Sequence, residues 1–377
     1  MFVILGIAAL LSVPPDSPRL DLTSASTPHT SGILITNSDA ISFLRGIEAA
    51  QDGAELELQV TTRYGEGGST PPEVFNESHF VQRLHVRQLV EHEQYRIVST
   101  FVETNVHLAA LKGQVHTMTW NGEQARLTTR GSSSSNPAQQ NARIDNVPTR
   151  DVRDLPTLTY CGLWVLQNSE FTSYSDLLAT ASPMGEPASD DEQTTEWTLA
   201  SPALSNTIIR IRMARTSSGL ALLGAHQECY STSEAMSTRD PAAIILRTSV
   251  VYGPADAGMS GLPRSARILH QHCRKNPVDG FWGASDVQLI STAKVEHDDA
   301  AFLAPLDDNA IVGDSRLNIA YHLGSTHINI DGRLLETQEP LKGDVGAKLS
   351  WWIAHGHFID TTPPRVTTAP TTPAKGK

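Results

Sequence analysis

Alternation of hydrophobic and polar residues dominates this chain and predicts β-strands. In residues 54–64, Leu56, Leu58 and Val60 alternate with glutamate and glutamine, so one face of the strand is buried while the other meets water. Similar short β-prone runs lie at residues 85–90, 95–102, 115–120, 196–200, 207–215, 220–227, 244–252, 265–273 and 287–296. Short turns between neighbouring segments indicate a meander of antiparallel strands.

Glycine-containing turns join some of these segments into predicted hairpins. The clearest is Asn121-Gly122, which predicts a two-residue type I′ turn because that turn needs positive φ at both central positions. Asp331-Gly332 and, more loosely, Ser218-Gly219 stand in similar surroundings. Side chains alternate along a strand, so one face of the first hairpin arm carries His116, Met118 and Trp120.

Two segments have helical rather than alternating spacing. From Ser38, the expected N-cap, the run to Gln51 places hydrophobic residues at helical intervals, and Gly53 ends it. A shorter helix is expected at residues 174–180. One face of the first helix must therefore be buried.

These elements predict an α+β fold. We expect a large curved antiparallel sheet, an open half-barrel, with helices covering its concave side. It is assigned to residues 34–360, with a surface insertion near 131–148 that contains four consecutive serines. Residues 18–33 are expected to form a flexible lead-in and the Thr/Pro-rich residues 361–377 a disordered tail.

Residues 1–17 are expected to be a signal peptide. The apolar run from Phe2 to Val13 is too short to span a bilayer and suits the hydrophobic region of a secretory signal. No Lys or Arg precedes the run, so a buried N-terminal strand or helix is the alternative. A signal peptide implies a periplasmic or secreted protein.

Composition narrows the class of protein further. Hydrophobic residues make up 39% of the 377 residues and charged residues 19%, which is typical of a folded soluble protein. The formal net charge of -12 argues against a general nucleic-acid-binding surface, which needs clustered Lys and Arg. We therefore expect no nucleic-acid partner, and the sequence predicts no transmembrane span.

Candidate chemistry is sparse. Cys161, Cys229 and Cys273 lie far apart and form no zinc-ligand pattern, so they are either free thiols or one disulfide and a free thiol. The pairs His270/His272 and His355/His357 supply two ligands each, whereas a zinc site needs three or four. There is no G-x-S-x-G motif. We assign no catalytic residue, metal ligand or cofactor.

The order of a signal-like start, an amphipathic helix and a long meander with a later helix resembles the LolA-like superfamily of outer-membrane lipoprotein carriers, in particular its large secreted bacterial relatives. The resemblance is carried by SDAISFLRGIEAAQ followed by LELQVTTRY, by the hairpin at Trp120-Asn121-Gly122, and by a late segment that contains Phe302, Pro305, Val312 and Asp314. It implies an unclosed β-barrel that holds acyl chains or other apolar ligands beneath its helices.

The resemblance leads us to expect a non-enzymatic envelope protein that binds a lipid, an acylated polypeptide or another apolar ligand. The side chains expected to line the cavity are Phe43, Leu44, Ile47, Leu56, Leu58, Phe101, Met118 and Trp120. The same side chains would otherwise pack as ordinary core. The alternative functions are an envelope-sensing or scaffolding module with protein partners and, after that, a metal-dependent hydrolase that uses the H-x-H pairs.

Overall fold

The computed structural model describes a large part of the chain. The described residues are 34–66, 75, 79–89, 94–131, 138–147, 155–161, 163–165, 171–189, 193–200, 206–255, 261–272, 281–296, 298–330, 332–355 and 358–360. The predicted signal peptide at 1–17, the lead-in at 18–33 and the tail at 361–377 lie outside them, as do Cys273 and His357.

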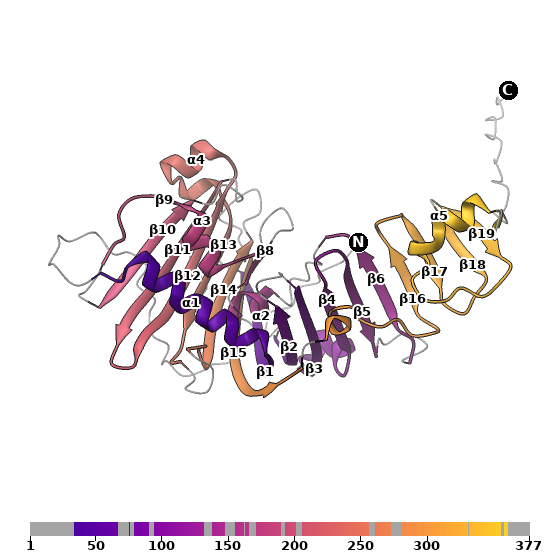
Figure 1. Cartoon of the computed structure of the whole chain (residues 1–377), viewed down its shortest axis with the longest axis horizontal. Helices are drawn as coiled ribbons and strands as arrows, with labels where there is room; N and C mark the ends of the chain where they lie inside the picture. Colours follow the sequence, from indigo (N-terminus) through magenta and orange to yellow (C-terminus); the bar gives the residue numbers. More distant parts are fainter. Residues whose placement is uncertain are drawn as a thin grey trace, which may run out of the picture.

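One open sheet of 18 strands organises the described residues (Figure 1). Its strands are β1 (Ala54–Glu66), β2 (His79–Leu89), β3 (Gln94–Thr104), β4 (Val115–Trp120), β5 (Ala125–Arg130), β6 (Asn141–Asp145), β9 (Ser182–Pro183), β10 (Thr194–Ala200), β11 (Thr207–Thr216), β12 (Gly219–Tyr230), β13 (Ile244–Tyr252), β14 (Ser265–His272), β15 (Phe281–Lys294), β16 (Ile311–Asp314), β17 (Ile319–His322), β18 (His327–Ile330), β19 (Arg333–Thr337) and β20 (Phe358–Asp360). Two short strands, β7 (Leu163–Val165) and β8 (Phe171–Ser173), pair separately.

Helices are few and short beside this sheet. The α-helices are α1 (Asn37–Asp52), α2 (Leu155–Tyr160), α3 (Tyr174–Thr180), α4 (Ser233–Thr238) and α5 (Gly346–Ala354). The 3-10 segments are η1 (Val106–Leu111), η2 (Pro241–Ala243) and η4 (Asp299–Phe302). Helix α3 has the bounds that the sequence predicts. Helix α1 begins two residues earlier than expected, because Thr36 rather than Ser38 is its N-cap and accepts the N–H of Asp39.

Strand pairing places the first strand in the middle of the sheet. The spatial order is β9, β10, β11, β12, β13, β14, β15, β1, β2, β3, β4, β5, β6, β16, β17, β18, β19, β20. Strand β1 pairs with β2 on one side and with β15 on the other, from Ala54 opposite Lys294 to Glu66 opposite Phe281. The two halves of the chain therefore share one sheet.

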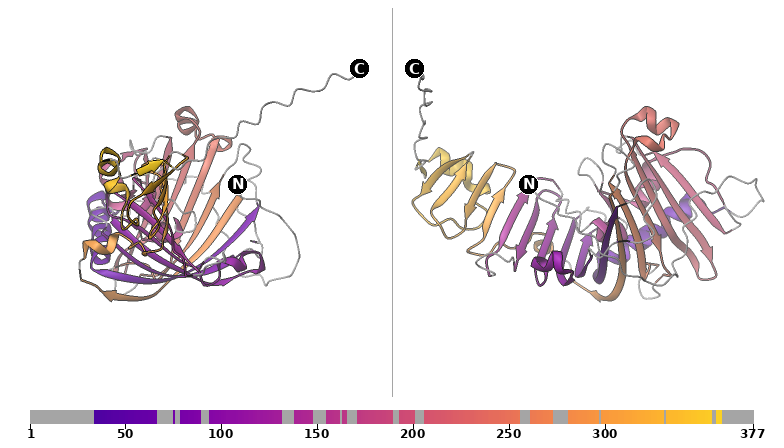
Figure 2. Two further views of the ribbon diagram at one scale, coloured as in Figure 1. Left: turned by 90° about the vertical axis from the view of Figure 1, so that its right-hand side faces the viewer. Right: turned by 180° about the vertical axis from the view of Figure 1, so that it is seen from behind.

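The sheet is open and curved, and its α+β class agrees with the sequence prediction (Figure 2). The prediction of a purely antiparallel sheet is wrong at one place, because β6 and β16 pair in parallel, with Ile144 beside Asp314. A parallel neighbour requires a long crossover connection, and here the connection contains all of β7 to β15. No local pattern in the sequence reveals such a pairing.

The apolar side of the sheet changes face near β5. Met118 and Trp120 pair with Leu127 and Ala125, and all of these belong to a first core beneath α1, α2 and α3. Their neighbour Arg126 points to the other face, where its register partner Ile144 belongs to a second core with β16 to β19 and α5. Helices α1 and α5 therefore cover opposite faces of one continuous sheet.

The hairpins occur where the sequence predicts them, but the first turn differs in type. Trp120 pairs with Ala125, so the loop has four residues instead of two. Gly122 has φ +93°, whereas Asn121 is not among the residues with positive φ. The Asn121 side chain instead accepts the N–H groups of Glu123 and Gln124 at 3.0 and 2.7 Å, which is an Asx-type turn.

The expected insertion near 131–148 contains a strand that the sequence analysis did not predict. Strand β6 lies between β5 and β16. Only Ala142 and Ile144 face the second core, so the strand is mostly polar and its sequence does not show clear alternation. The late residues of the resemblance lie near this junction. Phe302, Val312 and Asp314 are buried, whereas Pro305 is exposed.

We expect Leu58→Ala to lower the free energy of unfolding by about 3 kcal/mol, because the Leu58 side chain is fully buried in the central strand. The matched control Leu334→Ala, at a position that is 36% exposed, should change it by less than about 0.5 kcal/mol. Urea unfolding followed by circular dichroism measures both. Equal effects of the two substitutions would contradict the central position of β1.

Candidate functional site

The residues predicted to line a cavity lie in or against the first core. Six of them are buried members of this core: Leu44, Ile47, Leu56, Leu58, Met118 and Trp120. Phe43 is partly buried and packs against the same cluster. Phe101 is also buried and contacts Phe80 and His116, with ring centroids 5.3 and 5.2 Å apart. These side chains largely pack against one another and against the helices.

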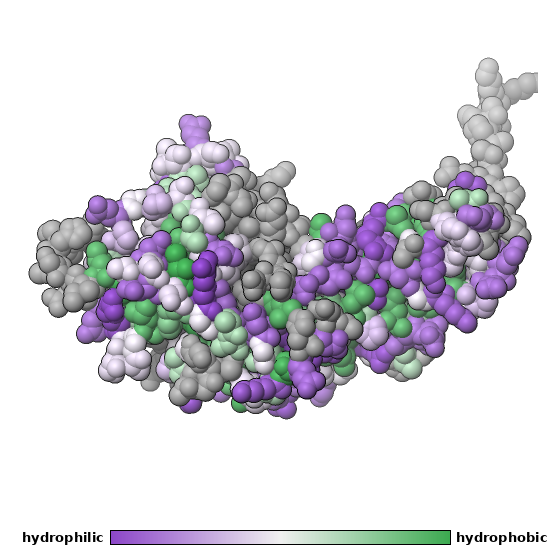
Figure 3. Space-filling model, viewed as in Figure 1, coloured by the Kyte–Doolittle hydropathy of each residue, from purple (hydrophilic) through white to green (hydrophobic). Residues whose placement is uncertain are grey.

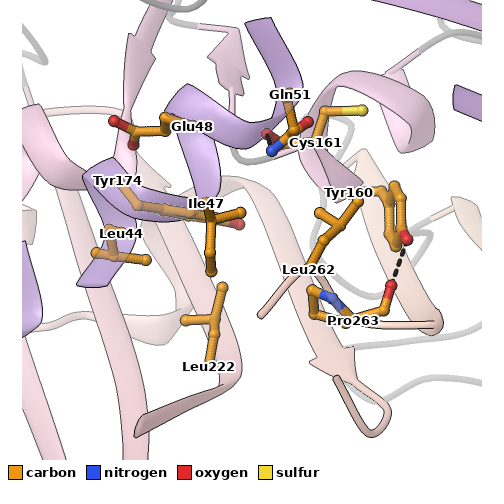
Figure 4. A pocket seen from close by; sticks show the side chains of 10 residues that line it. All are labelled: Leu44, Ile47, Glu48, Gln51, Tyr160, Cys161, Tyr174, Leu222, Leu262 and Pro263. Carbon is orange, nitrogen blue, oxygen red and sulfur yellow. Dashed lines mark hydrogen bonds between the residues drawn. The ribbon is translucent and has the colours of Figure 1, made fainter. Parts of the chain in front are cut away.

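A narrow cleft remains where α1 meets α2, α3 and the sheet (Figure 4). Its walls are formed by Leu44, Ile47, Glu48, Gln51, Tyr160, Cys161, Tyr174, Leu222, Leu262 and Pro263. The free space inside it is about 20 Å³, which holds about one water molecule. Sites for small molecules usually measure about 300–1,000 Å³, so the cleft as it stands admits no lipid.

Glu48 is the acidic residue of this cleft, and it joins α1 to α3. The backbone N–H and the hydroxyl of Ser175 donate to its carboxylate, at 3.3 and 2.6 Å. Ser173, the N-cap of α3, also lies close enough to donate to it. Burial raises the pKa of the Glu48 carboxyl above its usual value, and these donors offset only part of that increase.

Buried amides close the other end of the cleft. The side-chain amide of Gln51 donates to the Cys161 carbonyl at 3.3 Å and accepts from the amide of Gln88. The Cys161 thiol is buried, and burial raises its pKa to about 12. A thiol held protonated in this way is a poor nucleophile, so the cleft has no reactive cysteine.

Tyrosine hydroxyls tie α2 and α3 to the sheet beside the cleft. The hydroxyls of Tyr174 and Tyr252 lie 2.9 Å apart, and Tyr252 donates to the Thr159 carbonyl at 3.0 Å. Tyr160 donates to the Pro263 carbonyl. Burial raises the pKa of Tyr174 and of Tyr252 well above the ordinary value, so both hydroxyls remain protonated donors. These bonds fix the helices in place.

Each of the two histidine pairs has only one described side chain, because His357 and the side chain of His272 lie outside the described part. No group of three His, Cys, Asp or Glu side chains with suitable geometry occurs among the described residues. The His270 ring is hydrogen-bonded to the Thr248 hydroxyl at 2.9 Å. The His355 ring is hydrogen-bonded to the Trp351 carbonyl at 2.7 Å and stacks on the indole ring of Trp351. Cys161 and Cys229 are buried free thiols.

Several residues of the cleft were missed by reasoning from the sequence. Glu48 and Gln51 follow Leu44 and Ile47 at helical spacing, so the helix pattern was a signal for them. Tyr160, Leu222, Leu262 and Pro263 come from three distant segments that only the tertiary fold brings together.

This chain matches solved structures, but no protein-family model and no curated protein matches it. The chain is similar to a chain in the complex structure of Pseudomonas aeruginosa MucA/MucB, with 10% identity and a TM-score of 0.18, over 69% of this chain and 100% of that one. A crystal structure of MucB in complex with MucA(peri) gives 8% identity and a TM-score of 0.17 with the same coverage.

Within the residues that the structure describes, none of the helices has both the length and the apolar character needed to cross a bilayer.

We expect Glu48→Gln to stabilise the protein at neutral and higher pH. The raised pKa of Glu48 means that the fold favours the protonated carboxyl. The protonated carboxyl therefore contributes its full share to the free energy of unfolding below the unfolded-state pKa, and this share is lost as pH rises through the folded-state pKa. Glutamine keeps the acceptor for Ser175 without the buried charge. Thermal unfolding should show a higher Tm for the variant at about pH 8 and a smaller difference at about pH 4. Glu123→Gln, which removes an exposed carboxylate, is the control.

Proposed function

We propose that this chain is a non-enzymatic envelope protein that binds a polypeptide partner on the surface of its sheet. The observation that supports this proposal is the filling of the first core by the protein's own side chains. Only about 20 Å³ remains free in the cleft beneath α1, far less than an acyl chain needs. Under this proposal the resemblance to the LolA-like group would be one of fold, with α1 to α3 on the concave side.

The surface of the α1 face fits the same proposal. Hydrophobic residues on this face lie in separate small groups among hydrophilic ones (Figure 3). A large continuous apolar patch is typical of proteins that bind lipids or membranes through an exposed surface. A periplasmic location follows from the signal-like run at Phe2 to Val13 and is part of the proposal.

A second candidate is the binding of an apolar ligand after α1 moves away from the sheet. The observation that favours it is the small apolar contact of α1, whose buried residues are Ala40, Leu44, Ile47 and Gln51. Exposing Leu44 and Ile47 would cost about 1.5–3 kcal/mol for each side chain, which a bound acyl chain could offset. In this case the ligand replaces the helix instead of occupying an existing cavity.

Native mass spectrometry of the full chain separates the two candidates. We expect the purified protein to carry no lipid and to take up no fluorescent fatty acid, because the cleft has no room for one. The double variant Leu44→Ala with Leu222→Ala weakens the contact of α1 with the sheet, so uptake of the fatty acid by this variant alone would show that the assay detects binding once α1 is loosened. Stoichiometric uptake by the unmodified chain would contradict the polypeptide proposal and favour displacement of α1.

A further inference from the structure

The face of the sheet opposite α1 carries ordered clusters of arginine and carboxylate side chains. We call this the outer face and define it by the side chains of β1, β2, β3 and β11 to β15 that alternate with the first core. The view from behind shows the strands of this half in front and α1 behind them (Figure 2). The outer face is therefore not covered by α1.

A first cluster lies across β14, β15 and β1. Asp286 on β15 stands between Arg267 on β14 and Arg63 on β1, with N–O distances of 3.7 and 3.0 Å. The three side chains are 45%, 43% and 41% exposed for Arg267, Arg63 and Asp286, so the cluster is open to solvent. Two guanidinium groups and one carboxylate leave one net positive charge.

A second cluster on β11, β12 and β13 has the same composition but is more buried, with Arg210 32%, Arg247 15% and Glu228 13% exposed. Glu228 on β12 stands between Arg210 on β11 and Arg247 on β13, at 3.5 Å from each. His226 lies 3.3 Å from the same carboxylate. Burial opposes ionisation of Glu228, but His226 and Arg210 outweigh it and lower the pKa to about 2. The carboxylate is therefore charged at neutral pH, and again one net positive charge remains when the histidine is neutral.

A third cluster lies on β1, β2 and β3. Glu55 on β1 bonds to Arg87 on β2 at 2.6 Å, and Arg87 is the register partner of Arg96 on β3. His85 lies 3.3 Å from the same carboxylate. Two like charges opposite each other on paired strands repel, and the single carboxylate compensates only one of them. This cluster has the same excess of one positive charge.

The three clusters place positive charge on one face of a chain whose net charge is -12. The remainder of the molecule is correspondingly more acidic. Such an uneven distribution attracts an acidic partner to this face and orients it. Arginine is suited to the contact because its planar guanidinium presents five N–H donors and binds carboxylates through two of them at once.

We propose that the outer face binds an acidic polypeptide segment, whose carboxylates bind Arg63, Arg267 and the arginines of the other two clusters. Neighbouring strands lie about 4.8 Å apart, and alternate side chains of an extended peptide lie about 6.8 Å apart, so an extended acidic segment can reach several clusters. The inference rests on the proposed function, in which the partner is a polypeptide, and it adds the charge and the place of that partner.

A membrane surface fits this face less well. The sheet is curved, so a flat bilayer would meet only part of it (Figure 2). Proteins that lie on membranes usually insert aromatic or other apolar side chains beside their basic residues. Among the described residues of the outer face the large aromatic side chains are buried, with Trp282 at 4% and Tyr230 at 3% exposure, so the exposed apolar side chains there, such as Ile245 and Val251 on β13, are aliphatic.

Fluorescence anisotropy with a labelled polyglutamate peptide of about 12 residues tests the proposal on the full chain at low salt, about 50 mM. The double variant Arg63→Glu with Arg267→Glu should weaken binding about tenfold or more. Arg130→Glu with Arg143→Glu makes the same change in net charge away from the clusters, at arginines that pair with Asp307 and Asp145, and should change binding less than about twofold.

Asp286→Asn keeps both arginines and removes the carboxylate between them, so it should strengthen binding about threefold. A gain in binding cannot result from a variant that fails to fold. Equal loss of binding in the two arginine pairs, or no binding by the unmodified chain, would overturn the proposal. Binding to phosphatidylglycerol vesicles through Arg63 without binding to polyglutamate would overturn it in favour of a membrane.

These outcomes are separate from those for the proposed function. Lipid uptake in native mass spectrometry removes the polypeptide proposal itself. Failure to bind polyglutamate, with no lipid taken up, removes only the acidic segment and the outer face.

Discussion

Pairing between β1 and β15 is the interaction on which the rest of the structure depends. It joins residues 54–66 to residues 281–294, so the chain must bring together segments more than 200 residues apart before its central strand has two neighbours. Helix α1 directly precedes β1, so the pairing of β1 with β15 also places α1 across strands from both halves of the chain. Contacts so distant in sequence are slow to form, because the entropy of closing the intervening chain is lost before they stabilise the fold. The cleft and the outer face both exist only after this step.

A second constraint is the change of apolar face between β5 and β6. A sheet of this length with a single apolar face would need helices along its whole extent. Here α1 to α3 cover the first core on one face, and α5 covers the second core on the opposite face. Where the apolar face changes, the strands make contacts on both of their faces. Arg126 is buried there and donates to the Ala304 carbonyl at 3.0 Å and to Asp344 at 3.3 Å, so the segment after η4 is held against the face that α1 leaves bare. A buried arginine without these partners would be strongly destabilising.

The packing of the first core limits where the proposed partner could bind. Tyrosine hydroxyls, buried amides and the bond between Glu48 and Ser175 hold the helices on the sheet with little free space between them. In the proposed function a partner binds on a surface, and the outer face carries arginine and carboxylate side chains that alternate across neighbouring strands. The same strands thus supply an apolar side for stability and a charged side that the proposed partner would contact, because side chains alternate along a strand.

The sequence by itself determined α1, α3 and most strands, together with the inward-facing side chains of those strands. Alternation in β1, helical spacing in α1 and the hairpin at Asn121-Gly122 all follow from interactions between residues close in the chain. It also identified Leu58, Met118 and Trp120 as inward-facing. Only the tertiary structure decided that β6 pairs with β16 in parallel, that the apolar face changes near Arg126, and that Asp286 lies between Arg63 and Arg267. These features depend on which distant strands become neighbours, and alternation fixes the face of a side chain within its own strand but not the partner strand beside it.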